Sequence, residues 1–540
     1  MNMESENPPA PEPAPANALF ADADVPKRRF TPAWSTLALV LGIALAVASL
    51  SVQPPRGDEI VPVDGEISAG DETTAEEGDA GSNPDLEAAG NDANGGDGPK
   101  GSAGTTVPGQ PTRIAGQPGA RPGQPGAAQV PADLACAAGK NGKNTDTGVT
   151  GTTIKLGSTV VQSGIGASFL GDVRFAMQAV VNKTNRAGGI CGRQIRLKLV
   201  DDGWDYRLGN DFLRNLVEDE KVFALAVVPS SEGLKAISDA GYLAKHGVPA
   251  IGTDGMLIGQ YTDPWIWPVA ASTISTMHIM AKQAHDAGAT KFGLVYETGY
   301  HFGIEGASAF NAAVKRLTGA DIDGYSDPRR APRCAGRFCG ISASNDAYTT
   351  EIQTFNSACE SCHFIGMLLE PTTAGKWMSG GGLRPHSGRR LGGVQPLFTA
   401  DFAKECGSAC HEMWLWTGYT PPLGDFLSRP AVATFVNDIK AMSSSADYTN
   451  SFVAGGYIGM QLVVKALQEV GPYLTRERIK QVLDSMSFDS GGLAPVLKWT
   501  PGNHFANTRM QAYSIQYKGG FNGWRDEQVS LEDPWVGQDG

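Results

Sequence analysis

The chain lacks the features that mark a catalytic or nucleic-acid-binding protein. Its 44 lysines and arginines are outnumbered by 57 aspartates and glutamates, which gives a formal net charge of −13. It carries no basic stripe, so a nucleic-acid partner is not expected. The eight histidines are scattered, and the sequence contains no P-loop, nucleophile elbow or zinc-binding helix motif. The sequence therefore predicts a protein that is not an enzyme and that uses neither a metal nor a cofactor.

Cysteine is absent from the first 135 residues, so no lipid-anchored cysteine follows the charge-free segment 34–52. That segment is long enough to cross about 30 Å of hydrocarbon as a helix. A basic triplet at 27–29 precedes it and predicts a cytoplasmic N-terminus, with everything after residue 52 outside. The sequence Ala46-Val47-Ala48 resembles a signal-peptidase site. A retained single-pass anchor is the preferred interpretation, and a cleaved export signal, which would give a secreted protein, is the alternative.

Aromatic residues are missing from 53–131, which carries 13 acidic and 4 basic residues among many Gly, Ala and Pro. Such a composition cannot bury enough apolar surface to fold, and its unevenly spaced glycines exclude a collagen repeat. This part is expected to be an extended linker. Residues 1–33, rich in Pro and Ala, are likewise expected to be disordered. The globular part is therefore 132–540, where 39 acidic and 37 basic residues nearly balance.

From about residue 152, short apolar runs alternate with patterns of helical period. Strands are expected at 154–161, 197–201, 222–228, 249–252, 292–296, 364–369, 396–399, 413–417 and 511–517, and helices at 169–186, 208–219, 232–245, 273–287, 304–317, 430–442, 452–470 and 475–485. This rhythm predicts an α/β fold of parallel sheets covered by helices on both faces. Two lobes are expected, one from about 150–268 and 396–470, the other from about 272–395 and 475–525.

The run from Val180 to Asp202, VVNKTNRAGGICGRQIRLKLVDD, joins a helix end, a glycine turn and a strand ending in paired Asp. It resembles the first βαβ unit of type I periplasmic binding proteins, the solute receptors of branched-chain amino-acid-type ABC transporters. Residues 227–255 and 292–310 resemble two further segments of that family. The resemblance covers most of 150–520 and is weakest across 325–360. It implies two lobes that close on a small molecule, with a separate permease and ATPase as partners.

Ligands of open α/β sheets bind beyond the carboxyl ends of the strands, at the N-termini of the following helices. Four loops occupy such places, and their candidate ligand-binding residues are Ser163, Ser168, Ser230, Ser231, Thr253, Tyr296, Tyr300, Glu370 and Thr372. The resemblance implies that the serines at 230 and 231 and Thr253 bind a carboxylate. It also implies that a tyrosine and an acid of the second lobe, with Glu297 nearby, meet an ammonium group.

Several of these residues have a structural alternative. Ser168 and Ser230 could serve only as helix caps, Glu370 could cap the helix that follows it, and Tyr300 could pack in the hinge region. Five further aromatic residues are candidates to line the cleft, although burial in the core is their commoner fate: Trp204, Tyr206, Trp265, Trp414 and Trp416.

Eight cysteines in an exported domain indicate disulfides. Nearness in sequence suggests the pairs Cys136–Cys191, Cys334–Cys339, Cys359–Cys362 and Cys406–Cys410. Cys359-Glu-Ser-Cys362-His363 also matches the pattern of c-type haem attachment. His363 leads directly into an apolar strand, however, and no second axial ligand is evident, so haem is not expected.

These observations predict a membrane-tethered, extracytoplasmic receptor that captures an amino acid or a related small carboxylate or amide for an ABC-type importer. The alternative is a membrane-anchored sensor or protein-binding scaffold that uses the same fold.

Overall fold

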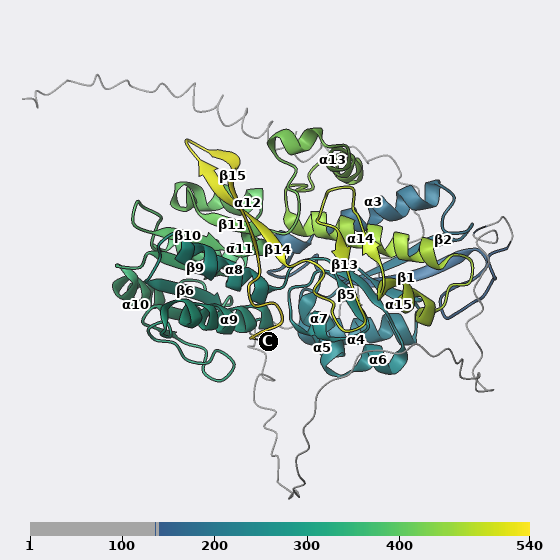
Figure 1. Cartoon of the computed structure of the whole chain (residues 1–540), viewed down its shortest axis with the longest axis horizontal. Helices are drawn as coiled ribbons and strands as arrows, with labels where there is room; N and C mark the ends of the chain where they lie inside the picture. The colour runs from purple at the N-terminus through teal and green to yellow at the C-terminus, as the bar shows by residue number, and fades with distance from the viewer. Residues whose placement is uncertain (1–135, 137–139, 540) are drawn as a thin grey trace, which may run out of the picture. The chain divides into compact units, whose positions relative to one another are not determined.

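The computed structural model describes residue 136 and residues 140–539 (Figure 1). The expected disordered segment 1–33, the apolar segment 34–52 and the linker 53–131 lie outside these residues. Among the residues described, no helix combines the length and the apolar character needed to cross a membrane.

The first lobe contains a five-stranded parallel sheet in the order β2-β1-β3-β4-β5. Its strands are β1 (Thr153–Val160), β2 (Gln194–Asp201), β3 (Ala224–Ala226), β4 (Ala250–Thr253) and β5 (Ile266–Pro268). On one face lie α3 (Val173–Arg186), α13 (Pro430–Met442) and α14 (Ser451–Val470), and on the other lie α4 (Tyr206–Glu218), α5 (Ser231–Asp239), α6 (Tyr242–His246) and α7 (Gly259–Thr262) (Figure 1). The short helix α2 (Ala167–Leu170) precedes α3.

The second lobe contains an eight-stranded sheet in the order β15-β14-β11-β10-β9-β6-β8-β7, of which β8, β6, β9, β10 and β11 are parallel. The strands are β6 (Phe292–Glu297), β7 (Cys334–Ala335), β8 (Phe338–Ile341), β9 (Phe364–Leu368), β10 (Arg390–Gly393), β11 (Trp414–Thr417), β14 (Arg509–Tyr517) and β15 (Phe521–Glu532). Its helices are α8 (Thr273–Asp286), α9 (His301–Thr318), α10 (Thr349–Cys359), α11 (Pro371–Ser379) and α12 (Ala400–Cys406).

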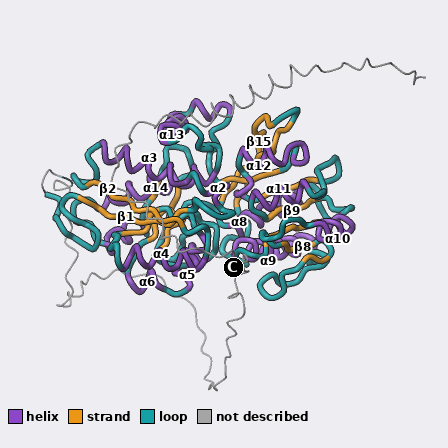
Figure 2. The backbone as a smooth tube through the Cα atoms, turned by 180° about the vertical axis from the view of Figure 1, so that it is seen from behind, coloured by secondary structure: helices purple, strands orange, loops and turns teal. Residues whose placement is uncertain are grey.

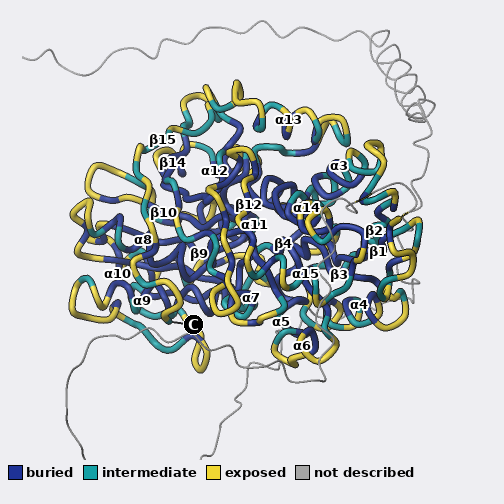
Figure 3. Tube along the Cα trace, turned by 45° about the vertical axis from the view of Figure 1, so that its right-hand side comes forward, coloured by how far each residue is buried: buried dark blue, intermediate teal, exposed yellow. Residues whose placement is uncertain are grey.

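Alternate residues of the second sheet bury against different helices. Leu294 belongs to the core that includes α8 and α9, whereas Val295 belongs to the core that includes α10, α11 and α12. A parallel sheet covered on both faces needs this nearly continuous apolar sequence. Buried residues accordingly run through both sheets and along α14 (Figure 3), and the view from behind separates β1 and β2 from β8 and β9 (Figure 2).

The chain crosses between the lobes three times, after β5, after β11 and before β14. The last crossing follows α15 (Arg476–Leu483) and a small hairpin of β12 (Ser487–Phe488) and β13 (Leu497–Lys498). Asn507 ties the three crossings together, because its Nδ2 donates to the carbonyl oxygens of Val269 (3.1 Å) and Gly418 (3.4 Å). This buried amide marks the hinge between the lobes.

The structure differs from the expected elements in the middle of the chain. The strand expected at 396–399 is wrong, since 395–397 form a 3-10 helix and the strand is β10 at 390–393. Pro396 has no N–H for a strand ladder, whereas Gly392 and Gly393 let the strand fit against large neighbours such as Trp416. The expected lobe bounds also differ from the structure. β11 was expected in the first lobe but pairs within the second sheet, and α15 was expected in the second lobe but packs against α14 of the first.

Candidate ligand-binding cleft

A small pocket lies between the lobes beside the first crossing. Residues of both lobes and of the crossing line it: Met256, Ala271, Thr273, Thr276, Val394, Gln395, Pro396 and Phe452. The lining is mostly apolar, with two threonines and one glutamine as its polar groups. The enclosed space holds only about one water molecule, so the lobes must part to admit a solute. The hydroxyl of Thr276 donates to the carbonyl oxygen of Ser272 (3.0 Å), which leaves its oxygen able to accept a further bond.

The sequence did not predict any of these lining residues, because they lie outside the loops at the carboxyl ends of the expected strands. The one feature of the sequence that could have indicated them is the crossing between the lobes. Helix α8 begins directly after it, capped by Ser272, whose hydroxyl accepts from the backbone N–H of Ser275 (2.9 Å). The first turn of α8 contributes Thr273 and Thr276 to the pocket.

A row of aromatic rings leads away from the pocket across the lobe boundary. Phe452 contacts Phe169 (centroids 5.4 Å apart), Phe169 contacts Trp204 (5.2 Å), and Trp204 stacks on Tyr300 of the second lobe (4.3 Å, 15° between planes). Trp204 has a φ of +66°, an uncommon value for a residue with a side chain. The stack shows that two of the aromatic candidates, Trp204 and Tyr300, meet between the lobes.

The start of α5 is buried, and one of its two serines is hydrogen-bonded within the first lobe. Ser230 and Ser231 are fully buried. The hydroxyl of Ser231 accepts from Nε1 of Trp204 (3.2 Å) and lies 3.7 Å from Sδ of Met256. Burial raises the pKa of Asp202 to about 7. Ser231 thus contacts a tryptophan of its own lobe, whereas the buried hydroxyl of Ser230 has no hydrogen-bond partner among the described residues.

The other candidates of the first lobe fall into two groups. Thr253, at the end of β4, is fully buried, and within the described part of the chain its hydroxyl has no hydrogen-bond partner. Ser163 and Ser168 are exposed. Ser168 lies inside α2, where its hydroxyl donates to the carbonyl oxygen of Ile165 (3.2 Å), and the N-cap of that helix is Gly166.

In the second lobe, Glu370 caps α11 by accepting from the backbone N–H of Thr372 (2.7 Å) and of Thr373. Its own N–H donates to Oε2 of Glu297 (3.1 Å), whose Oε1 has no partner among the described residues. Burial, together with the charges of Glu370 and Glu232, raises the pKa of Glu297 well above its ordinary value. Two acids therefore lie buried side by side at the carboxyl edge of the second sheet.

The remaining aromatic candidates are placed differently. Tyr296 packs against Phe338 of β8 (4.8 Å), and Nε1 of Trp416 donates to Oε1 of Gln283 (2.8 Å) in the core. Trp414 also lies in the core, next to Phe364, and Trp265 lies under the ammonium group of Lys480. Tyr206 of the first lobe reaches across the lobe boundary, where the centroid of its ring lies 5.6 Å from that of His301.

The eight cysteines form the bonds Cys136–Cys191, Cys334–Cys339, Cys359–Cys362 and Cys406–Cys410. Both cysteines of the haem-like pattern are therefore joined to each other. The three short-range bonds all lie in the second lobe, in the core that also holds α10, α11 and α12.

Comparisons with known proteins agree with this architecture. A family model described as periplasmic binding protein matches residues 153–329 and 387–520. No curated protein matches the sequence at a significant level. A fatty acid ABC transporter substrate-binding protein from Thermomonospora curvata superimposes with a TM-score of 0.59 at 18% identity, covering 75% of this chain and 97% of that one.

Two other solved structures share the fold. A solute-binding protein of an ABC transporter from Rhodopseudomonas palustris HaA2, in complex with p-hydroxybenzoic acid, has a TM-score of 0.58 at 16% identity and covers 71% of this chain and 97% of that one. A leucine-binding protein from Thermotoga maritima MSB8 has a TM-score of 0.56 at 14% identity and covers 69% of this chain and 99% of that one. At these identities the likeness concerns the fold.

Proposed function

The chain belongs to the periplasmic binding protein family, and on that premise we propose that it captures a small solute by closing two lobes over it and presents it to an ABC-type importer. The solute class we propose is an amino acid or a related small carboxylate or amide. The chain would be held outside the membrane by segment 34–52, and a separate permease and ATPase would complete the transporter.

The observation that supports this proposal is a pocket lined by both lobes at the hinge. Thr273 and Thr276 come from the second lobe just past the crossing, Met256 comes from the first lobe, and Phe452 from α14. A ligand that contacts both lobes favours the closed state over the open one, because it gains part of its binding energy only on closure. Two proteins with this fold, a leucine-binding protein and one in complex with p-hydroxybenzoic acid, support a small carboxylate as the solute class.

The test is thermal unfolding of the full-length chain, with its disulfides intact, against amino acids, amides, p-hydroxybenzoate and short carboxylates. Binding to the native state alone raises apparent stability by about 2.7 kcal/mol at a hundredfold excess over Kd. We expect a saturable rise for one of these compound classes. No rise with any compound would contradict the proposed solute class.

A pair of variants locates the binding. Thr276→Val should weaken the affinity for the active compound about tenfold, the effect of losing one polar contact of about 1.4 kcal/mol. Thr434→Val is the matched control, since Thr434 also donates to the carbonyl oxygen four residues earlier (2.8 Å) but is exposed on α13. Equal weakening by both variants would place the ligand elsewhere.

A further inference from the structure

Beyond the aromatic row, an acid of the first lobe contacts the first residue of a helix in the second. Glu232, in the first turn of α5, is 2% exposed. Its Oε1 accepts from the backbone N–H of His301 (2.8 Å), and its Oε2 lies 2.5 Å from Nδ1 of the same residue. The N-terminus of a helix favours a negative charge, because its first N–H groups have no partner within the helix. One carboxylate of α5 thus bonds both to the first backbone N–H of α9 and to the imidazole of the same residue.

This contact lies next to the end of the aromatic row, on the lobe boundary. Ala271 and Thr273 of the pocket adjoin the first crossing, and Tyr300, the last ring of the row, directly precedes His301. The Trp204–Tyr300 stack and the Tyr206–His301 ring contact cross the lobe boundary beside it. Because the contact joins α5 of the first lobe to α9 of the second, an opening that separates these two helices breaks it.

We propose that Glu232 and His301 form a latch that holds the two lobes closed without ligand while the imidazole is charged, and releases them when it is neutral. A hydrogen bond between two charged groups is stronger than one between neutral groups, and this pair is largely shielded from water, with side chains 3% and 15% exposed. The latch concerns the closure step of the proposed receptor and does not depend on which solute is bound.

The surroundings of His301 set the direction of the pH dependence. Burial lowers its pKa, but the hydrogen bond and the charge of Glu232 outweigh that effect, so that the pKa of His301 is raised. The charged groups that act on His301 are Glu232 and Lys235 of α5 and Glu305 of α9. A raised pKa in the closed state means that the latch is fully present below the ordinary histidine pKa and is lost as pH rises through the raised value.

The test measures closure directly, in the full-length chain and with no solute added. Fluorescent probes attached to noncanonical amino acids at Ala244 and Ala320, both exposed and in different lobes, report the distance between the lobes by energy transfer. We expect high transfer at about pH 6 and a fall in the closed-to-open ratio of about tenfold by about pH 9, the size typical of losing one charged hydrogen bond.

Three variants separate the latch from other titrating groups. His301→Gln and Glu232→Gln should both lower transfer at about pH 6 and remove most of the pH dependence, whereas His285→Gln, which alters a half-exposed histidine of α8, should behave as the wild type. Far-UV circular dichroism checks that each variant folds. If one of the two latch variants does not fold, the other still tests the latch. The proposal would be overturned if energy transfer depended on pH in both latch variants as it does in the wild type, or if it did not change with pH in the wild type.

Discussion

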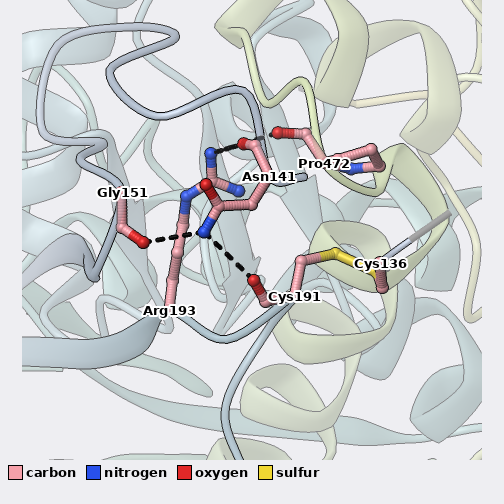
Figure 4. The surroundings of a disulfide bond; sticks show 6 residues. All are labelled: Cys136, Asn141, Gly151, Cys191, Arg193 and Pro472. Atoms are coloured by element: carbon pink, nitrogen blue, oxygen red, sulfur yellow. Dashed lines mark hydrogen bonds between the residues drawn. A yellow bond between two sulfur atoms is a disulfide. The ribbon is translucent and has the colours of Figure 1, made fainter. Parts of the chain in front are cut away.

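Arg193 is predicted to hold the N-terminal entry of the globular part against the first lobe. Its side chain is completely buried, yet its partners are carbonyl oxygens. Nε donates to Thr150 (2.6 Å), and Nη2 donates to Lys143 (3.0 Å). Nη2 also donates to Asn141 and to Pro472 (3.1 Å), as Figure 4 shows. One guanidinium thus connects the segment 141–151 with β2 and with the loop after α14.

The magnitude follows from what Arg193→Met would leave behind. Methionine fills much of the same volume but donates no hydrogen bond, so four carbonyl oxygens lose a charged donor. Each such bond contributes about 1.5–3 kcal/mol, but the bonds share one group and are not additive, and removing the buried charge recovers part of its desolvation cost. We expect the free energy of unfolding to fall by about 3–5 kcal/mol. Arg193→Lys should recover little, because one ammonium cannot reach oxygens that the planar fork spans.

The assay is urea unfolding of the full-length chain under non-reducing conditions, followed by far-UV circular dichroism. The control is Arg384→Met, at an exposed position of the second lobe, which should change stability by less than about 0.5 kcal/mol. A loss below about 1 kcal/mol for Arg193→Met, or an equal loss in the control, would refute the reasoning.

The disulfide Cys136–Cys191 fastens the same segment, and Nδ2 of Asn141 donates to the carbonyl oxygens of Gly151 (2.7 Å) and Cys191 (3.2 Å) between the two attachments (Figure 4). Neighbouring contacts that order one segment are coupled. Replacing both cysteines by serine in the Arg193→Met background should therefore cost less than it does in the wild type.

Three further changes test the hinge, a buried acid and a helix contact. Asn507→Ala removes the donor shared by two crossings, so we expect it to lower stability by about 1–3 kcal/mol and to broaden the interlobe distances seen by energy transfer; an unchanged distribution would contradict a hinge role. Asp202 has a pKa raised to about 7 by burial, so wild-type stability is lost as pH rises from about 4 to about 7, and the gain in Asp202→Asn should grow over that range in urea unfolding. A pH-independent difference would show that the acid does not titrate there. Gly459→Ala would place a Cβ 2.3 Å from the carbonyl oxygen of Gly252 in β4 and should cost about 1–3 kcal/mol in the same assay, whereas Gly502→Ala, with open space around it, should cost little.

The fold could be predicted where one segment determines its own structure. The apolar runs that became β1, β6 and β9, and the helical pattern that became α13, lie within a residue or two of their expected bounds. The long edge strand β15 was missed, because NGWRDEQVSLE has no apolar alternation and is ordered by its pairing with β14. The membership of β11 in the second sheet was missed for the same reason, since sheet order depends on partners far away in sequence.

The site was harder to predict than the fold, because the function of a polar side chain depends on what the other lobe brings to it. Glu370 was correctly placed at the end of a strand, and its carboxylate caps α11, as the structural alternative for this residue predicted. Glu232 carries no local motif that indicates a contact between the lobes, whereas it bonds to His301, 69 residues later in the chain. Pocket residues such as Gln395 carry no local motif, so only the three-dimensional arrangement identifies them.

The contacts between the lobes also bear on how tightly a solute is held. When the binding-competent state is only partly populated, the apparent affinity is reduced in proportion to that population. The Trp204–Tyr300 stack and the Glu232–His301 contact favour the closed state before any solute arrives. They therefore reduce the free energy that the solute must supply for closure, but they also require the lobes to open before the solute can enter. A receptor built in this way gains affinity and loses association rate, and charge on His301 should shift the balance between the two.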